Sequence, residues 1–387
     1  MRDRSRRGVL LAGFMLATFS SQAIWVTFSP VSTNVSEYLG VSKERIGLLA
    51  LVYPILFLAL TLPSGILLDR RFKASFLTGI TLTGLGGVLR LANPSSYEWL
   101  LACQIMAGIG QPFILNAFAP FSARFYSESK ERVVSLLSLS MYLGIIYALG
   151  TGYTIYEEWG MYGLIVPIAV VSLASIVLVL SSINAVATSI VESGVAGRGY
   201  LFELRRVVRF RDLWMLGGIL GLGVALFDNM SIWLEAVLAG IGLGHIAGRS
   251  LAFALIAGLI GISFIPAIVT RRNARTMYIR MVSLIAALSF IALALETTSL
   301  SVAALIPLVG FLMLPAYPII MEWIATYHDP RLHGSATGFI GLTSRILTVV
   351  LASSAVALLE SPVSYFTFLA VLSLLAFIIA LLLPVNR

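Results

Sequence analysis

Three ionisable side chains lie inside long apolar runs of this sequence: Asp228, Glu322 and Arg345. A carboxylate in such a place can exchange a proton or pair with a base, and a guanidinium can bind a carboxylate. Asp228 therefore predicts either proton or ligand chemistry or an ion pair with Arg345. Arg345 predicts either an anionic ligand group or Asp228 as its partner. Glu322 lies close to the end of its run, where bracing between helices is the stronger expectation.

The residue types that bind metals or form disulfides are scarce. The single cysteine, Cys103, excludes an internal disulfide and a cysteine-based metal site. The three histidines, His245, His328 and His333, lack the spacing of a metal-ligand set. A phosphate-binding loop ends in Gly-Lys-Ser or Gly-Lys-Thr, and none of the three lysines follows a glycine. We therefore expect no metal, no cofactor and no ATP-driven step.

The elements that hold these side chains must be built for lipid. Of the 387 residues, 59% are hydrophobic and 11% are charged, and the mean hydropathy is +0.96. Soluble domains carry roughly 25% charged residues. Soluble enzymes and disulfide scaffolds are therefore excluded. The net charge of +8 would suggest nucleic acid in a soluble protein, but here the sidedness of the charges matters more, and no nucleic-acid partner is expected.

Apolar runs long enough to cross a bilayer recur through the whole chain. A spanning helix needs about 20 apolar residues, whereas a β-barrel strand would need roughly 10. The pattern predicts an all-α membrane protein with twelve transmembrane helices. They are expected at 8–33, 46–68, 74–92, 98–121, 133–156, 160–182, 212–238, 247–270, 274–295, 300–327, 335–359 and 362–384.

The basic residues gather on one side of the predicted helices. Twenty-one of the 26 lysines and arginines fall before the first span, after the even-numbered spans or at the end of the chain. Cytoplasmic loops carry the excess of basic residues. We expect a multi-pass protein of the cytoplasmic (plasma) membrane with both termini in the cytoplasm.

The spans form two sets of six that align at an offset near 200 residues. A six-helix bundle is predicted over 1–182, a polar cytoplasmic linker over 183–211, and a second bundle over 212–387. Two such pseudo-repeats are the architecture of many secondary transporters.

The loop between spans 2 and 3 carries the sharpest motif, which runs from Gly65 through Asp69 and Arg70 to Lys73. It resembles the signature of the major facilitator superfamily. The resemblance implies the major facilitator fold and a cytoplasmic gate formed by Gly65, Asp69, Arg70 and Lys73. Glu322, by its depth in its own span, is expected to brace this gate. An ordinary basic turn is the alternative interpretation of this loop.

A narrower resemblance rests on three segments. They are Gln22 to Ser29, Gln111 to Leu115, and Glu322 followed by Pro330 and the stretch Gly334 to Gly338. Together they resemble the feline leukaemia virus subgroup C receptor family, which is associated with choline and haem transport. The resemblance implies that Trp25 and Gln111 face a solute cavity and that Glu322 matches the family's helix 10 glutamate.

Two positions depart from that family. Met230 stands where the family has an aromatic residue, and Arg345 stands where it has a glutamine. Aromatic faces attract a cation, whereas a fixed guanidinium repels it. The departures predict a zwitterionic or anionic organic solute. Polar residues of other helices complete the expected cavity, although joining helices is their commoner role. The predicted cavity set is Trp25, Gln111, Asn116, Asp228, Met230, Tyr317 and Arg345.

These observations predict a secondary transporter that moves a small organic solute by alternating access, as a uniporter or coupled to an ion. Asp228 and Glu322 are the acids expected to be placed for a coupling proton. A transport-incompetent receptor or sensor is the first alternative, although no run of the sequence is long enough for an effector domain. A membrane-embedded enzyme is the second, and the scattered histidines argue against it.

Overall fold

The computed structural model describes residues 2–186, 207–329 and 332–384. Its internal contacts divide the chain into two units, Met1–Ala196 and Gly197–Arg387, which are treated separately below. Most of the predicted linker over 183–211 lies outside the described residues. The bundle boundaries predicted at residues 182 and 212 stay predictions.

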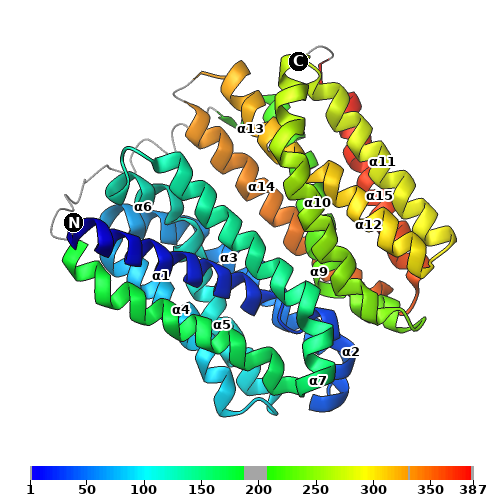
Figure 1. Ribbon diagram of the computed structural model, residues 1–387. Helices are drawn as coiled ribbons and strands as arrows, with labels where there is room; N and C mark the ends of the chain where they lie inside the picture. Colours follow the sequence, from blue (N-terminus) through cyan, green and yellow to red (C-terminus); the bar gives the residue numbers. More distant parts are fainter. Residues whose placement is uncertain (1, 187–206, 330–331, 385–387) are drawn as a thin grey trace. The chain divides into compact units, whose positions relative to one another are not determined.

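The N-terminal unit is built from helices that follow one another closely (Figure 1). The bounds are α1 Arg2–Trp25, η1 Ser29–Val31, α2 Ser32–Leu39, α3 Lys43–Arg70, α4 Phe72–Leu89, η2 Arg90–Ala92, α5 Tyr97–Leu115, α6 Phe118–Phe125 and α7 Lys130–Val186.

A single glycine divides the long helix α7. Gly160 has φ 59° and ψ −151°, a backbone conformation open to glycine and costly for other residues. Its positive φ ends one helix and lets the chain begin the next. The helices predicted at 133–156 and 160–182 are therefore both present within α7.

The C-terminal unit repeats this arrangement. Its bounds are α9 Arg211–Ala239, α10 Gly244–Arg271, α11 Arg275–Leu295, α12 Ser299–Met313, α13 Ala316–Tyr327, α14 His333–Ser354, η5 Ala355–Leu358 and α15 Pro362–Leu381.

Eleven helical stretches of the described chain are long and apolar enough to cross a membrane, and the longest holds the two helices separated at Gly160. Every regular element in the described parts is helical. The prediction of an all-α membrane protein with two six-helix pseudo-repeats is confirmed.

The order of packing also repeats. In the N-terminal unit α1 packs on α7, α3 on α5, and α4 on both α5 and α7. In the C-terminal unit α9 packs on α14 and α15, α10 on α12, and α11 on both α12 and α15. The sixth helix of each bundle therefore contacts the first and the third.

Three predicted spans are broken within their length. Helix 1 stops at Trp25 and resumes at Ser32, helix 4 stops at Leu115 and resumes at Phe118, and helix 10 stops at Met313 and resumes at Ala316. A proline cannot donate to the carbonyl four residues before it, and its ring clashes with that carbonyl. Each break lies about four residues before a proline: Pro30, Pro120 and Pro318.

A proline alone does not end a helix here. The helix α3 contains Pro54 and Pro63 and runs unbroken from Lys43 to Arg70. A break within a membrane also needs partners for the carbonyls that it frees. At the helix 1 break, side chains of α5 and of the residue that follows α4 supply such partners, as described below.

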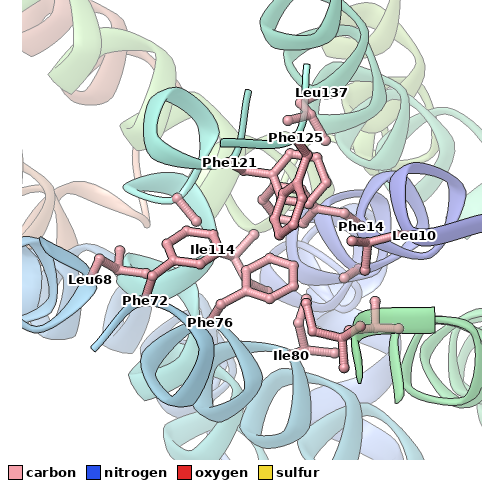
Figure 2. Close-up of a cluster of buried hydrophobic side chains, with 14 of the residues drawn as sticks. Leu10, Phe14, Leu68, Phe72, Phe76, Ile80, Ile114, Phe121, Phe125 and Leu137 are labelled. Carbon is pink, nitrogen blue, oxygen red and sulfur yellow. The ribbon is translucent and has the colours of Figure 1, made fainter. Parts of the chain in front are cut away.

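Aromatic side chains close one end of the N-terminal unit. Phe14 of α1 meets Phe76 of α4 and Phe121 of α6 with ring centroids 4.8 Å apart in both cases. Figure 2 shows these rings together with Phe72 and Phe125. The cluster anchors the short helix α6 against α1 and α4, and so fixes the helix 4 break from one side.

Candidate functional site

The C-terminal unit brings Asp228 and Arg345 together. Arg345 Nη1 of α14 lies 3.6 Å from Asp228 Oδ2 of α9. The Asp228 side chain is 4% exposed and the Arg345 side chain 31% exposed. The carboxylate is therefore buried and its guanidinium partner partly exposed, and the pairing is one of the two arrangements that the sequence left undecided.

This ion pair is loose. Among the described residues, Asp228 Oδ2 has no hydrogen-bond partner, and neither do the nearby Asn229 Oδ1 and Ser231 Oγ, although all three atoms are buried. Buried polar atoms without partners are uncommon in native structures and often mark a site for water or a ligand. Residues 228–231 thus offer several acceptors in the middle of an apolar helix.

Two further members of the predicted cavity set lie on this unit with different exposure. Tyr317, near the start of α13, is 53% exposed, and Arg345 acts electrostatically on its hydroxyl group. Met230 is buried at 4% exposure. Tyr317 therefore lies near Arg345, whereas Met230 packs inside the unit.

In the N-terminal unit, Trp25 is the last residue of α1. Its side chain is buried, and Nε1 donates to Ala50 O of α3 at 3.1 Å. One turn earlier, Gln22 is 3% exposed and its Nε2 has no partner among the described residues. Gln111 is buried on α5, one turn before the helix 4 break.

Asn116 lies at the helix 4 break itself. Its Nδ2 donates to Thr61 O at 2.9 Å and to Ser64 Oγ at 2.9 Å, both on α3. Its amide therefore joins two helices in this structure, the commoner role for such a residue.

The predicted gate residues of the N-terminal unit lie at its surface. Asp69 and Arg70 end α3 and are exposed, and Lys73 is partly exposed at the start of α4. A Cβ on Gly65 would meet no atom within 4 Å. Their assignment to a gate stays a prediction.

Glu322 has a partner that the sequence did not predict. Arg275, the first residue of α11, donates from Nη2 to Glu322 Oε1 at 2.7 Å and from Nε to Oε2. Thr326 Oγ1 also donates to Oε1 at 2.7 Å. This pair ties α11 to α13 and fits the bracing role expected for Glu322.

Sequence reasoning missed two buried charges. Glu235, seven residues after Asp228 on α9, is 3% exposed, so the expectation that Asp228 and Glu322 alone are placed for protons was too narrow. Arg90, near the end of the span predicted at 74–92, is 1% exposed directly after α4, and the sequence analysis gave it no role. Its position directly after the glycine-rich stretch of α4 was the available signal.

Comparisons with known proteins give a matching family and several related sequences. The family model described as Major Facilitator Superfamily matches residues 12–353. Solute carrier family 49 member A3 of Danio rerio is 23% identical over 361 residues, which cover 88% of this chain and 76% of that protein. The choline/ethanolamine transporter FLVCR1 of Mus musculus is 26% identical over 128 residues, 32% of this chain and 23% of that protein.

A solved structure supports the fold. A bacterial homologue of the human lysosomal transporter Spinster, in an inward-facing and unoccupied conformation, matches with a TM-score of 0.72 at 15% identity. The match covers 99% of this chain and 98% of that one.

Proposed function

Since the chain belongs to the Major Facilitator Superfamily, we propose that it carries a small organic solute bearing a carboxylate, with Arg345 as the group that binds this carboxylate. The observation that supports the proposal is the pair of Arg345 and Asp228, in which the guanidinium is partly exposed, the carboxylate is buried, and the two approach at 3.6 Å.

The broader function is established. The family match and the transporter relatives identify a secondary transporter of a small solute in a multi-pass membrane protein that is not an enzyme. The resemblance to the feline leukaemia virus subgroup C receptor family is confirmed by the same relatives. The receptor and enzyme alternatives are not favoured.

Charge balance favours a zwitterion over a bare cation. The pair of Asp228 and Arg345 is neutral as a unit, and a zwitterionic solute keeps the site neutral when it binds. A quaternary ammonium ion alone would leave a net positive charge in a medium of low dielectric constant, which is costly. The carboxylate of the solute would accept two parallel hydrogen bonds from the Arg345 guanidinium.

In the second part of the proposal, Trp25 and Gln111 contribute to solute recognition from the N-terminal unit. Trp25, buried in this structure, would supply an aromatic ring, and Gln22, one turn earlier on α1, has an amide nitrogen without a partner among the described residues. Asp228 and Glu235 on α9 are the candidates for a coupling proton. The basic loops and the even number of spans support a plasma-membrane location with cytoplasmic termini.

Two compounds that share a trimethylammonium group test the solute class. Choline ends in a hydroxyl group and glycine betaine in a carboxylate. We expect proteoliposomes with the wild-type protein to take up radiolabelled glycine betaine and not choline, and Arg345→Gln to abolish this uptake. Arg271→Gln, at an exposed arginine of α10, is the matched control and should transport normally. Uptake of choline alone, or of neither compound, would contradict the proposed solute class.

A further inference from the structure

The broken end of helix 1 is held by two buried side chains. Because α1 stops at Trp25, the last carbonyls of the helix lose their regular amide partners. Arg90 Nη2 donates to Ile24 O at 3.2 Å, and Gln104 Nε2 donates to Ile24 O at 3.3 Å and to Trp25 O at 3.4 Å. Ile24 O also accepts from Thr27 N at 3.5 Å and from Thr27 Oγ1 at 3.1 Å, so Arg90 and Gln104 supplement a weak backbone donor there.

The same guanidinium binds two further acceptors. Arg90 Nη1 donates to Thr27 Oγ1 at 3.0 Å, and Nη2 also donates to Gln104 Oε1. The ring of Phe28 lies 5.4 Å from the guanidinium carbon. Arg90 therefore binds Ile24 before the end of α1 and Thr27 after it.

Close helix packing brings Arg90 to this place. A Cβ on Gly86 would lie 2.7 Å from Cys103 O of α5, and a Cβ on Gly87 would lie 2.4 Å from Ser172 Oγ of α7 and 2.9 Å from Ile24 Cδ1. These glycines let the end of α4 lie directly against α5, α7 and α1. Arg90 follows Gly87 by three residues and so reaches the end of α1.

The charge of Arg90 is balanced without an acid. No carboxylate in residues 2–186 or in the other described segments lies within ion-pair distance of it. The C-terminal end of a helix carries about half a negative charge. Arg90 therefore complements the end of α1, and its planar fork covers several acceptors at once, which a lysine ammonium cannot do in this geometry.

We propose that Arg90 and Gln104 are positioning residues that fix the end of α1 and thereby hold Trp25 in the orientation used for transport. The part that concerns transport rests on the proposed function, in which Trp25 meets the solute. The part that concerns the helix end stands on the geometry alone.

Hydrogen–deuterium exchange of the purified protein tests the second part without any solute. In Arg90→Gln and Arg90→Lys, we expect exchange in a peptide over residues 20–31 to rise about tenfold, roughly the loss of one hydrogen bond from a charged group. Peptides from the C-terminal unit should not change. Arg45→Gln, which removes the exposed partner of Glu98, is the matched control and should leave residues 20–31 protected.

Chemical rescue separates positioning from general instability. Arg90→Ala leaves the space of the guanidinium empty, and millimolar guanidinium ion should restore protection of residues 20–31, whereas equimolar sodium ion or urea should not. Unchanged exchange in the Arg90 variants, or exchange that rises equally in every peptide of the N-terminal unit, would overturn the proposal.

The link to transport is tested by combining variants. Arg90→Lys and Trp25→Phe, made singly and together, should raise the KM for glycine betaine uptake without adding their effects, because both act through Trp25. Additive effects would overturn this link. If the wild type does not take up glycine betaine, the proposed solute fails, whereas the exchange and rescue experiments still decide the role of Arg90.

Discussion

Arg275 and Glu322 form a two-point ion pair between the first turn of α11 and the middle of α13. The Arg275 side chain is 4% exposed and the Glu322 side chain 32% exposed. A guanidinium and a carboxylate that meet at two points hold their helices in a fixed orientation. The C-terminal unit therefore carries a rigid clamp between α11 and α13, which belong to the ninth and tenth spans.

The clamp predicts a loss of stability on neutralisation. Glu322→Gln leaves Arg275 buried without its counter-charge, and we expect the free energy of unfolding to fall by about 2 kcal/mol, less than for a fully buried pair because Glu322 is partly exposed. Thermal melting in detergent measures the change. Glu360→Gln, at an exposed loop carboxylate, is the control. Equal melting temperatures for wild type and Glu322→Gln would contradict the clamp.

A second prediction separates structure from transport at Asp228 and Arg345. Arg345→Gln leaves the buried Asp228 carboxylate without its counter-charge and should destabilise the protein by roughly 3 kcal/mol, whereas Asp228→Asn should cost less because Arg345 is partly exposed. The double variant should melt close to the wild type, because no unpaired charge is left. It should still fail to take up glycine betaine if Arg345 binds the solute.

Melting and uptake each have an outcome that would contradict the prediction. A double variant that melts as low as the singles would refute an energetic pairing of the two side chains. A double variant that transports at the wild-type rate would show that the pair is only structural and that the solute binds elsewhere.

The predicted gate gives a third test. Asp69 is exposed at the end of α3, so Asp69→Asn should not change the melting temperature. We expect slower uptake, because the gate loses its charged residue. Glu128→Gln, at another exposed acid in a loop of the same unit, should transport normally. A normal rate in a correctly folded Asp69→Asn protein would remove Asp69 from the gate.

The topology is tested by labelling two introduced cysteines. Ser129→Cys lies between α6 and α7, and Ser299→Cys lies at the start of α12; both positions are exposed. In a Cys103→Ala background, an impermeant maleimide should label the first from the cytoplasm and the second from outside. Labelling of both from one face would contradict the twelve-helix topology.

The sequence was sufficient for the spans but not for their breaks. Length and hydropathy predict where a helix crosses the membrane. The two helices expected at 133–156 and 160–182 are present and are separated at Gly160. Pro30, Pro120 and Pro318 were visible, yet Pro54 and Pro63 look the same in sequence and do not end α3. At the helix 1 break the difference includes side chains from outside the helix, since Arg90 and Gln104 donate to the carbonyls at its end.

The candidate site was predictable where its partners were both charged side chains. Asp228 and Arg345 stand out because each is an ion in an apolar run, so pairing was one natural interpretation. Arg90 was missed because its partners include the carbonyl of Ile24, 66 residues away, and a carbonyl has no signature in a sequence. Glu235 was missed because it lies near a helix end, where acids are common.

The arginine at the end of α4 has a consequence for how the chain enters the bilayer during synthesis. The segments Phe72–Ala92 and Tyr97–Leu115 have mean hydropathies of 1.3 and 1.2, the lowest among the spans of the described chain. An arginine costs about 3 kcal/mol at the centre of a helix that the insertion machinery admits alone, and less near a helix end such as that of α4. Gln104, on the very next helix, can share the guanidinium from the start. The third and fourth spans, which contain α4 and α5, should therefore leave the translocon together, as a hairpin in which Arg90 and Gln104 are already hydrogen-bonded.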